Sequence, residues 1–172
     1  MSKRIKCTLS SESIRNAIKQ LETYQNSLQD KNEIFVQRLA ELGIPIINEN
    51  IALAQGDSDK SHNIYIKINR FGNYAQATLV CEGSGILFIE FGAGISYNTP
   101  AGTSPHPKGE EFGYTIGSYG QGKGKNESWV YVADSGEWVR SYGTEATMPV
   151  YKASVEIMQN IRRIAKEVFS MQ

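Results

Sequence analysis

Apolar residues follow a helical period at both ends of this chain and a period of two in its middle. Over residues 10–55 they recur at spacings of three, four or seven with polar residues between them, which predicts a helical region with one apolar face. Over residues 63–91 apolar and polar residues alternate between turns that contain glycine, which predicts a β-meander. Over residues 148–171 the helical period returns. Helices that enclose a sheet in this order predict an α+β fold rather than an alternating α/β fold.

The apolar stripe of the first region predicts one long helix or two helices joined near residues 27–31, with Ser10 or Ser11 as the N-cap. We expect this helix to stop or kink at residues 43–45, where Gly43 and Pro45 occur, and Thr147 to cap the C-terminal helix. The stripe consists of Ile14, Ile18, Leu21, Leu28, Phe35, Leu39 and Leu42.

The strands are expected to form a mostly antiparallel sheet of about five strands, packed by the helices. Residues 4–9 can add a short edge strand, and residues 129–141 predict a hairpin with Gly136 in its turn. The third strand of the meander, residues 86–91, is almost entirely apolar. We therefore expect it at the centre of the sheet, covered by helices on one face and by a neighbouring subunit on the other.

The length of 172 residues and an apolar content of 40% fit one domain, residues 1–172, with a core of its own. Eighteen Lys and Arg balance eighteen Asp and Glu, so no excess of positive charge favours DNA or an anionic membrane, and self-association is permitted. Cys7 and Cys81 lack C-x-x-C spacing and no secretory leader is visible, which predicts a reducing cytosol. No apolar run is long enough to span a bilayer, so we expect a soluble chain.

Residues 92–128 fit neither period, and glycine and proline are frequent among them. They far exceed the usual loop of about 4–6 residues, so we interpret them as a long flexible loop with a function. Its stretch GSYGQGKGK, residues 117–125, nearly matches the phosphate-binding motif G-x-x-x-x-G-K-[ST]. Gly124 replaces the hydroxyl residue, no helix is expected to follow, and glutamates balance the nearby lysines. A phosphate- or nucleotide-binding enzyme that uses this loop therefore stays only an alternative.

Candidates for catalysis and for metal binding are few. His62 and His106 are interpreted as solvated loop histidines, because no pair of residues has metal-ligand spacing. Glu90 is the only carboxylate within an apolar run, and we expect it to face away from the core or to pair with a lysine at an interface. Ser84, between two glycines, is interpreted as a turn residue. We therefore expect no catalytic residue, no metal site and no cofactor, and a protein that is not an enzyme.

Several short motifs occur in order along the second half of the chain: IEFGAG at residues 89–94, YGQGKG at 119–124, WVY at 129–131, SYGTEA at 141–146 and MPVYKA at 148–153. This succession resembles the minor structural proteins of tailed bacteriophages that join the head to the tail or complete the tail. The residues that carry the resemblance are Glu90, Phe91, Gly92, Gly94, Trp129, Tyr131, Gly143, Ala146, Met148 and Ala153.

The resemblance implies a non-enzymatic virion morphogenesis protein of a phage or prophage. Such a protein forms a ring of identical subunits at the neck or at the head-proximal end of the tail, and DNA only passes through the channel. Its partners are other copies of itself and other neck and tail proteins, without a membrane, and it is found in the virion and, during assembly, in the host cytoplasm. A prophage-encoded DNA-binding protein is a further alternative. The long loop is expected to contact partners through Tyr97, Phe112, Tyr114, Tyr119, Lys123 and Lys125.

Overall fold

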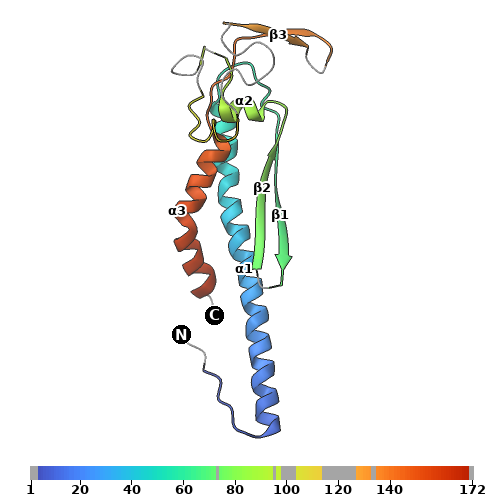
Figure 1. Ribbon diagram of the computed structural model, residues 1–172, viewed down its shortest axis with the longest axis vertical. Helices are drawn as coiled ribbons and strands as arrows, with labels where there is room; N and C mark the ends of the chain where they lie inside the picture. Colours follow the sequence, from blue (N-terminus) through green and yellow to red (C-terminus); the bar gives the residue numbers. More distant parts are fainter. Residues whose placement is uncertain are drawn as a thin grey trace.

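The computed structural model describes residues 4–72, 74–94, 96–97, 104–113, 127–132 and 135–170. Its elements follow the order helix, two strands, short helix, two strands, helix. The α+β class and the long helices near both ends of the sequence are therefore confirmed. Figure 1 shows an elongated molecule in which the first helix runs along most of the length.

The first helix, α1 (Ser11–Leu53), has 43 residues, which corresponds to about 65 Å at about 1.5 Å per residue. The side chain of Ser10 caps it by accepting a hydrogen bond from the backbone N–H of Ser13. Of the two possibilities left open by the sequence, the single helix is correct. The expected stop near Pro45 is wrong, because Pro45 lies inside α1. Ile47, in the turn that follows, is fully buried, and this packing outweighs the backbone hydrogen bond that proline cannot make.

A β-hairpin lies along α1 (Figure 1). Its strands β1 (Asn63–Phe71) and β2 (Tyr74–Glu82) pair antiparallel over their whole length. Because side chains alternate across a strand, one face carries Ile64 opposite Cys81 and Ile66 opposite Leu79. Ile64, Leu79 and Cys81 pack against the core, so the apolar face of the hairpin is the face turned towards α1.

The third strand expected at residues 86–91 is wrong, because these residues form the short helix α2 (Ile86–Phe91). Ile86, Ile89 and Glu90 are buried while Leu87 is about half exposed, which is the burial pattern of a helix. A stretch of five apolar residues interrupted only by Glu90 has no clear period of its own, so long-range packing decides its conformation. The expectation of a central strand covered by a neighbouring subunit therefore fails as well.

The second hairpin is confirmed: β3 (Trp129–Val132) pairs antiparallel with β4 (Trp138–Ser141). It forms a sheet separate from β1 and β2, so the described residues contain two sheets of two strands and not one sheet of about five. Residues 4–9, expected as an edge strand, are not part of either sheet. They lie beside the start of α1, at the opposite end of the molecule from the β3–β4 hairpin (Figure 1).

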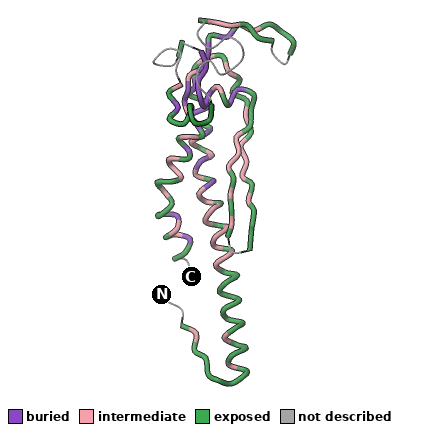
Figure 2. Tube along the Cα trace, in the orientation of Figure 1, coloured by how far each residue is buried: buried purple, intermediate pink, exposed green. Residues whose placement is uncertain are grey.

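The last helix, α3 (Pro149–Ser170), runs back along α1 in the opposite direction (Figure 1). Near its end the rings of Phe169 and Phe35 lie 5.8 Å apart. At Gly43, α1 lies close to both β2 and α3. A Cβ at this position would contact Leu79 of β2 and Ile157 of α3. The core gathers at the end of the molecule that contains α2 (Figure 2). It consists of Ile47, Ile51, Ala54, Ile86, Ile89 and Ala153.

Candidate functional site

Three of the sequence motifs meet beside α2. Ala93 and Thr144 exchange two backbone hydrogen bonds, with N···O distances of 3.0 and 2.8 Å. The backbone N–H of Thr147 donates to the carbonyl oxygen of Ile89 at 3.0 Å. We call this meeting of residues 89–94 with residues 141–151 the motif junction. It brings together residues about 50 positions apart in the sequence, which the motifs alone did not predict.

Glycine is required where the two backbones of the motif junction approach each other. Gly143 has a φ of +110°, and a Cβ at this position would lie 2.3 Å from the carbonyl oxygen of Ala93. Gly94 has a φ of +73°, and its Cβ would lie 2.9 Å from the ring of Trp129. Side chains are excluded at both positions by the backbone conformation and by the lack of space. Gly94 and Gly143, two of the three glycines of the resemblance, therefore have a packing role.

Glu90 is buried in the motif junction and caps α3 from outside that helix. Its carboxylate accepts hydrogen bonds from the backbone N–H groups of Val150 at 2.7 Å and Tyr151 at 2.8 Å. These N–H groups belong to the first turn of α3, where no carbonyl of the helix can reach them and where negative charge is favoured. Thr147 was expected to cap α3, but its hydroxyl donates to the carbonyl oxygen of Asn50 at 2.7 Å. The expectation that Glu90 faces away from the core or pairs with a lysine is also wrong.

His106 completes the surroundings of Glu90. Its Nε2 lies 3.0 Å from Oε1 of Glu90, and the two side chains are 3% and 7% exposed. The backbone N–H of Lys108 donates to Nδ1 of His106 at 3.0 Å, so the proton of the ring is on Nε2 and is donated to Glu90. The imidazole packs between the rings of Phe91 and Tyr151, with centroids 4.5 and 5.2 Å away.

The interpretation of His106 as a solvated loop histidine is therefore wrong. The usable signal was its position between Pro105 and Pro107, because prolines restrict the backbone on both sides of it. Asn50, which the sequence also did not single out, links the end of α1 to α3. Its carbonyl oxygen accepts from Thr147, and its side-chain oxygen accepts from Lys152 at 2.8 Å.

The remaining predicted residues divide into three groups. Phe91, Gly92, Ala146 and Ala153 are buried, and Met148 has a left-handed backbone with a φ of 55° immediately before α3. Trp129 lies against Gly94, whereas Tyr131 of the same strand is exposed. The residues of the expected contact loop are Tyr97 and Phe112, which are exposed, and Tyr114, Tyr119, Lys123 and Lys125, which lie outside the described residues together with the stretch 117–125.

The chemistry of the motif junction is that of an anchor. Three donors occupy the two oxygens of Glu90, and the carboxylate is nearly closed to solvent, so its hydrogen bonds hold α2, α3 and the segment around His106 together. Burial, and secondarily the charge of Glu90, raise the pKa of the Cys81 thiol nearby. No group of three potential metal ligands occurs among the described residues. No described helix has a stretch that is both long and apolar enough to cross a membrane.

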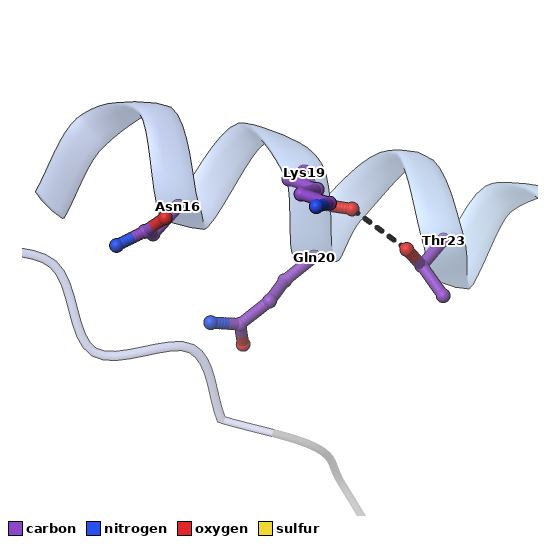
Figure 3. Close-up of a pocket in the computed structure, with 4 residues that line it drawn as sticks. All are labelled: Asn16, Lys19, Gln20 and Thr23. Atoms are coloured by element: carbon purple, nitrogen blue, oxygen red, sulfur yellow. Dashed lines mark hydrogen bonds between the residues drawn. The ribbon is translucent and has the colours of Figure 1, made fainter. Parts of the chain in front are cut away.

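A shallow pocket lies far from the motif junction, on the exposed part of α1 (Figure 3). Its lining residues are Asn16, Lys19, Gln20 and Thr23, and the hydroxyl of Thr23 donates to the backbone carbonyl of Lys19 at 2.9 Å. The hydroxyl is thus engaged within the helix. Comparisons with known protein families, with curated proteins and with solved structures find no match for this chain.

Proposed function

We propose that this chain is a non-enzymatic structural subunit of a tailed phage or prophage particle. It acts in head–tail joining or tail completion, as part of a ring at the neck or at the head-proximal end of the tail. The observation that carries the proposal is the motif junction. Three of the five segments on which the resemblance rests, 89–94, 141–146 and 148–153, are held together there by backbone hydrogen bonds and by Glu90. Motifs that contact one another in the folded chain support the resemblance more strongly than motifs that match the family but lie apart.

The surface of the β3–β4 hairpin supports an assembly role. Val130, Tyr131, Val132 and Trp138 are all exposed, and the Trp138 side chain is 76% exposed. Tryptophan and tyrosine are enriched at the centres of protein interfaces, where their burial contributes most of the binding energy. In Figure 1 the hairpin stands at one end of the molecule, clear of α1 and α3. We propose that a neighbouring subunit or another neck or tail protein covers it.

Incorporation into particles tests the proposal. A tagged wild-type chain expressed in the phage or prophage host is expected to co-purify with tailed particles, and its loss is expected to leave heads and tails unjoined or tails incomplete. Trp138→Ala should abolish incorporation while the purified chain keeps its circular dichroism spectrum. Met158→Ala is the matched control, because Met158 is an exposed apolar residue of α3 outside the hairpin. Normal tailed particles made without the chain would refute the proposal.

The two alternative functions give different results. A nucleotide-binding enzyme would be stabilised against heat by added nucleotide, and a DNA-binding protein would bind duplex DNA with an affinity that falls as salt rises. We expect neither effect. Removal of residues 117–125 is expected to impair incorporation and to leave the fold intact.

A further inference from the structure

The first part of α1 carries an apolar stripe that no other described element covers. Residues 11–28, which we call the uncovered segment, are almost all exposed and extend beyond both α3 and the β1–β2 hairpin (Figures 1 and 2). Ile14, Ile18, Leu21 and Tyr24 are 42–55% exposed. Apolar side chains at this spacing on one face of a helix are expected to pack against another element.

The stripe continues the face of α1 that is already covered further along. Gln25 precedes Gly43 by five turns at about 3.6 residues per turn, so both lie on one line along the helix. At Gly43 this line faces β2 on one side and α3 on the other. Both neighbours end at about the same level of α1, since Gln29 donates to the carbonyl oxygen of Gly72 in the hairpin turn and Phe35 contacts Phe169 near the end of α3. The uncovered segment thus prolongs an established interface.

We propose that the uncovered segments of two copies of this chain pair antiparallel as a short two-helix coiled coil. The heptad pattern places Ile14, Leu21 and Leu28 at one core position and Ile18 and Gln25 at the other. In one antiparallel register Ile18 lies opposite Leu21 of the partner subunit. The same register pairs residues 11 to 28 throughout, over about 27 Å, and ends where α3 and the hairpin begin to cover α1.

The residues that flank the stripe fit a second copy in this register. On one side Arg15 lies opposite Glu22 of the partner subunit, and two-fold symmetry gives this pair twice. On the other side the small Ala17 lies opposite the large Tyr24 of the partner subunit, again twice. Among the described residues neither Arg15 nor Glu22 forms a salt bridge within its own chain. In this register Gln25 lies opposite Ile14 of the partner subunit, so each chain contributes one polar position to the seam.

The antiparallel direction follows from the positions of α3 and of the β1–β2 hairpin along α1. Beyond residue 28, α3 and the hairpin flank the stripe, so a parallel partner would bring its own α3 and hairpin into the same space (Figure 1). An antiparallel partner places them at the opposite end. The N-terminal residues before α1 do not obstruct the pairing. They run past Asn16 and Gln20 (Figure 3), and the backbone N–H of Thr8 donates to the hydroxyl of Ser13 at 2.8 Å, so they lie to one side of the stripe.

This pairing goes beyond the proposed function. A contact that is the same on both copies closes into a dimer and cannot by itself propagate a ring. The ring proposed above therefore needs another surface, such as the β3–β4 hairpin. The two proposals can fail separately, because the pairing is measured on the purified chain and the particle role is measured by incorporation.

Sedimentation equilibrium of the purified full-length chain, over about 1 µM to about 1 mM, tests the pairing. The wild type should reach the mass of two chains. Leu21→Glu should raise the dissociation constant by about a hundredfold or more, because it places a charge in the seam twice. Thr23→Glu, on the opposite face of the same helix, should leave it unchanged. A wild type that stays at the mass of one chain, or a dimer that tolerates Leu21→Glu, would overturn the proposal.

A charge exchange tests the register. Arg15→Glu alone and Glu22→Arg alone should each weaken self-association about tenfold, since two attractive pairs become two repulsive ones. The double variant should restore wild-type association, and an equimolar mixture of the two single variants should form mixed dimers. If the double variant is as weak as the single variants, the antiparallel register is wrong.

Discussion

The two parts of α1 have the same apolar periodicity and very different surroundings. In the uncovered segment, residues 11–28, Ile18 is 50% exposed, whereas in residues 29–53, the covered segment, Ile47 is 1% exposed. Both side chains belong to one unbroken helix and to one apolar face. The difference arises from α3 and the β1–β2 hairpin, which reach only one of the two parts (Figure 2). A stripe in the sequence therefore predicts that a face will be covered but not whether the chain itself covers it.

The largest expected effect compares these two isoleucines. Ile47→Ala should lower the free energy of unfolding by about 4 kcal/mol, because it leaves a cavity in the core. Ile18→Ala should lower it by less than about 0.5 kcal/mol in a dilute sample in which two copies do not associate. Urea unfolding followed by circular dichroism measures both values. Equal losses would mean that the uncovered segment packs within its own chain.

The anchor of α3 should give the next largest effect. Glu90→Gln keeps the shape of the side chain but removes its charge and turns an N–H₂ group towards donors, so we expect a loss of about 2 kcal/mol in unfolding free energy. Glu41→Gln is the matched control, since Glu41 lies on the exposed surface of α1, where its side chain accepts a hydrogen bond from Gln37 at 2.8 Å. Its stability should change by less than about 0.5 kcal/mol. Equal values for the two variants would contradict the anchoring role.

The two cysteines should differ in reactivity, because one lies beside the uncovered segment and the other faces the covered segment. Cys7 is exposed beside the start of α1, whereas Cys81 lies in β2 on the face turned towards the covered segment, and its pKa is raised by burial and by Glu90. A raised pKa leaves less thiolate, which is the form that reacts. At pH 8 iodoacetamide should modify Cys81 at least about tenfold more slowly than Cys7, as measured by mass spectrometry. Similar rates would show that the hairpin opens readily from α1.

The smallest effect concerns the loop that follows the covered segment. Hydrogen bonds from Ser61, and then from Ser84, lower the pKa of Asp59 from its usual 3.8. A lowered pKa in the folded state stabilises the fold above pH 3.8 and ceases to do so as the pH falls through the folded-state value. Asp59→Asn should therefore lower Tm at pH 6 by roughly 1–3 °C, and this difference should shrink towards pH 3. A difference independent of pH would rule out this origin.

Local patterns predicted the elements whose signals are local. Ser10 and the repeating apolar residues gave α1, and alternation gave both hairpins within a few residues of their observed bounds. The conformation of residues 86–91 was not predictable in this way, because five apolar residues interrupted only by Glu90 satisfy a helix and a strand equally well. The prediction of about five strands was wrong for the same reason, because that sheet required residues 86–91 as its central strand.

The sequence predicted which residues form the motif junction, but it did not predict which of them contact one another. The motifs drew attention to Glu90, Gly94 and Gly143, which all lie at the motif junction. The role of Glu90 depends on α3 starting beside it, some 60 residues later in the sequence, and the burial of His106 depends on Phe91 and Tyr151. These are long-range contacts that no spacing in the sequence encodes.

The hydrogen bond between His106 and Glu90 also has a consequence for chain entropy. It ties the middle of the long stretch that joins α2 to β3 back to α2, and so divides one long loop into two shorter ones. The entropic cost of closing a loop rises only with the logarithm of its length, by about 0.6 kcal/mol for each doubling. A change of chain length after residue 113 should therefore cost little closure entropy, while Glu90 keeps its partners.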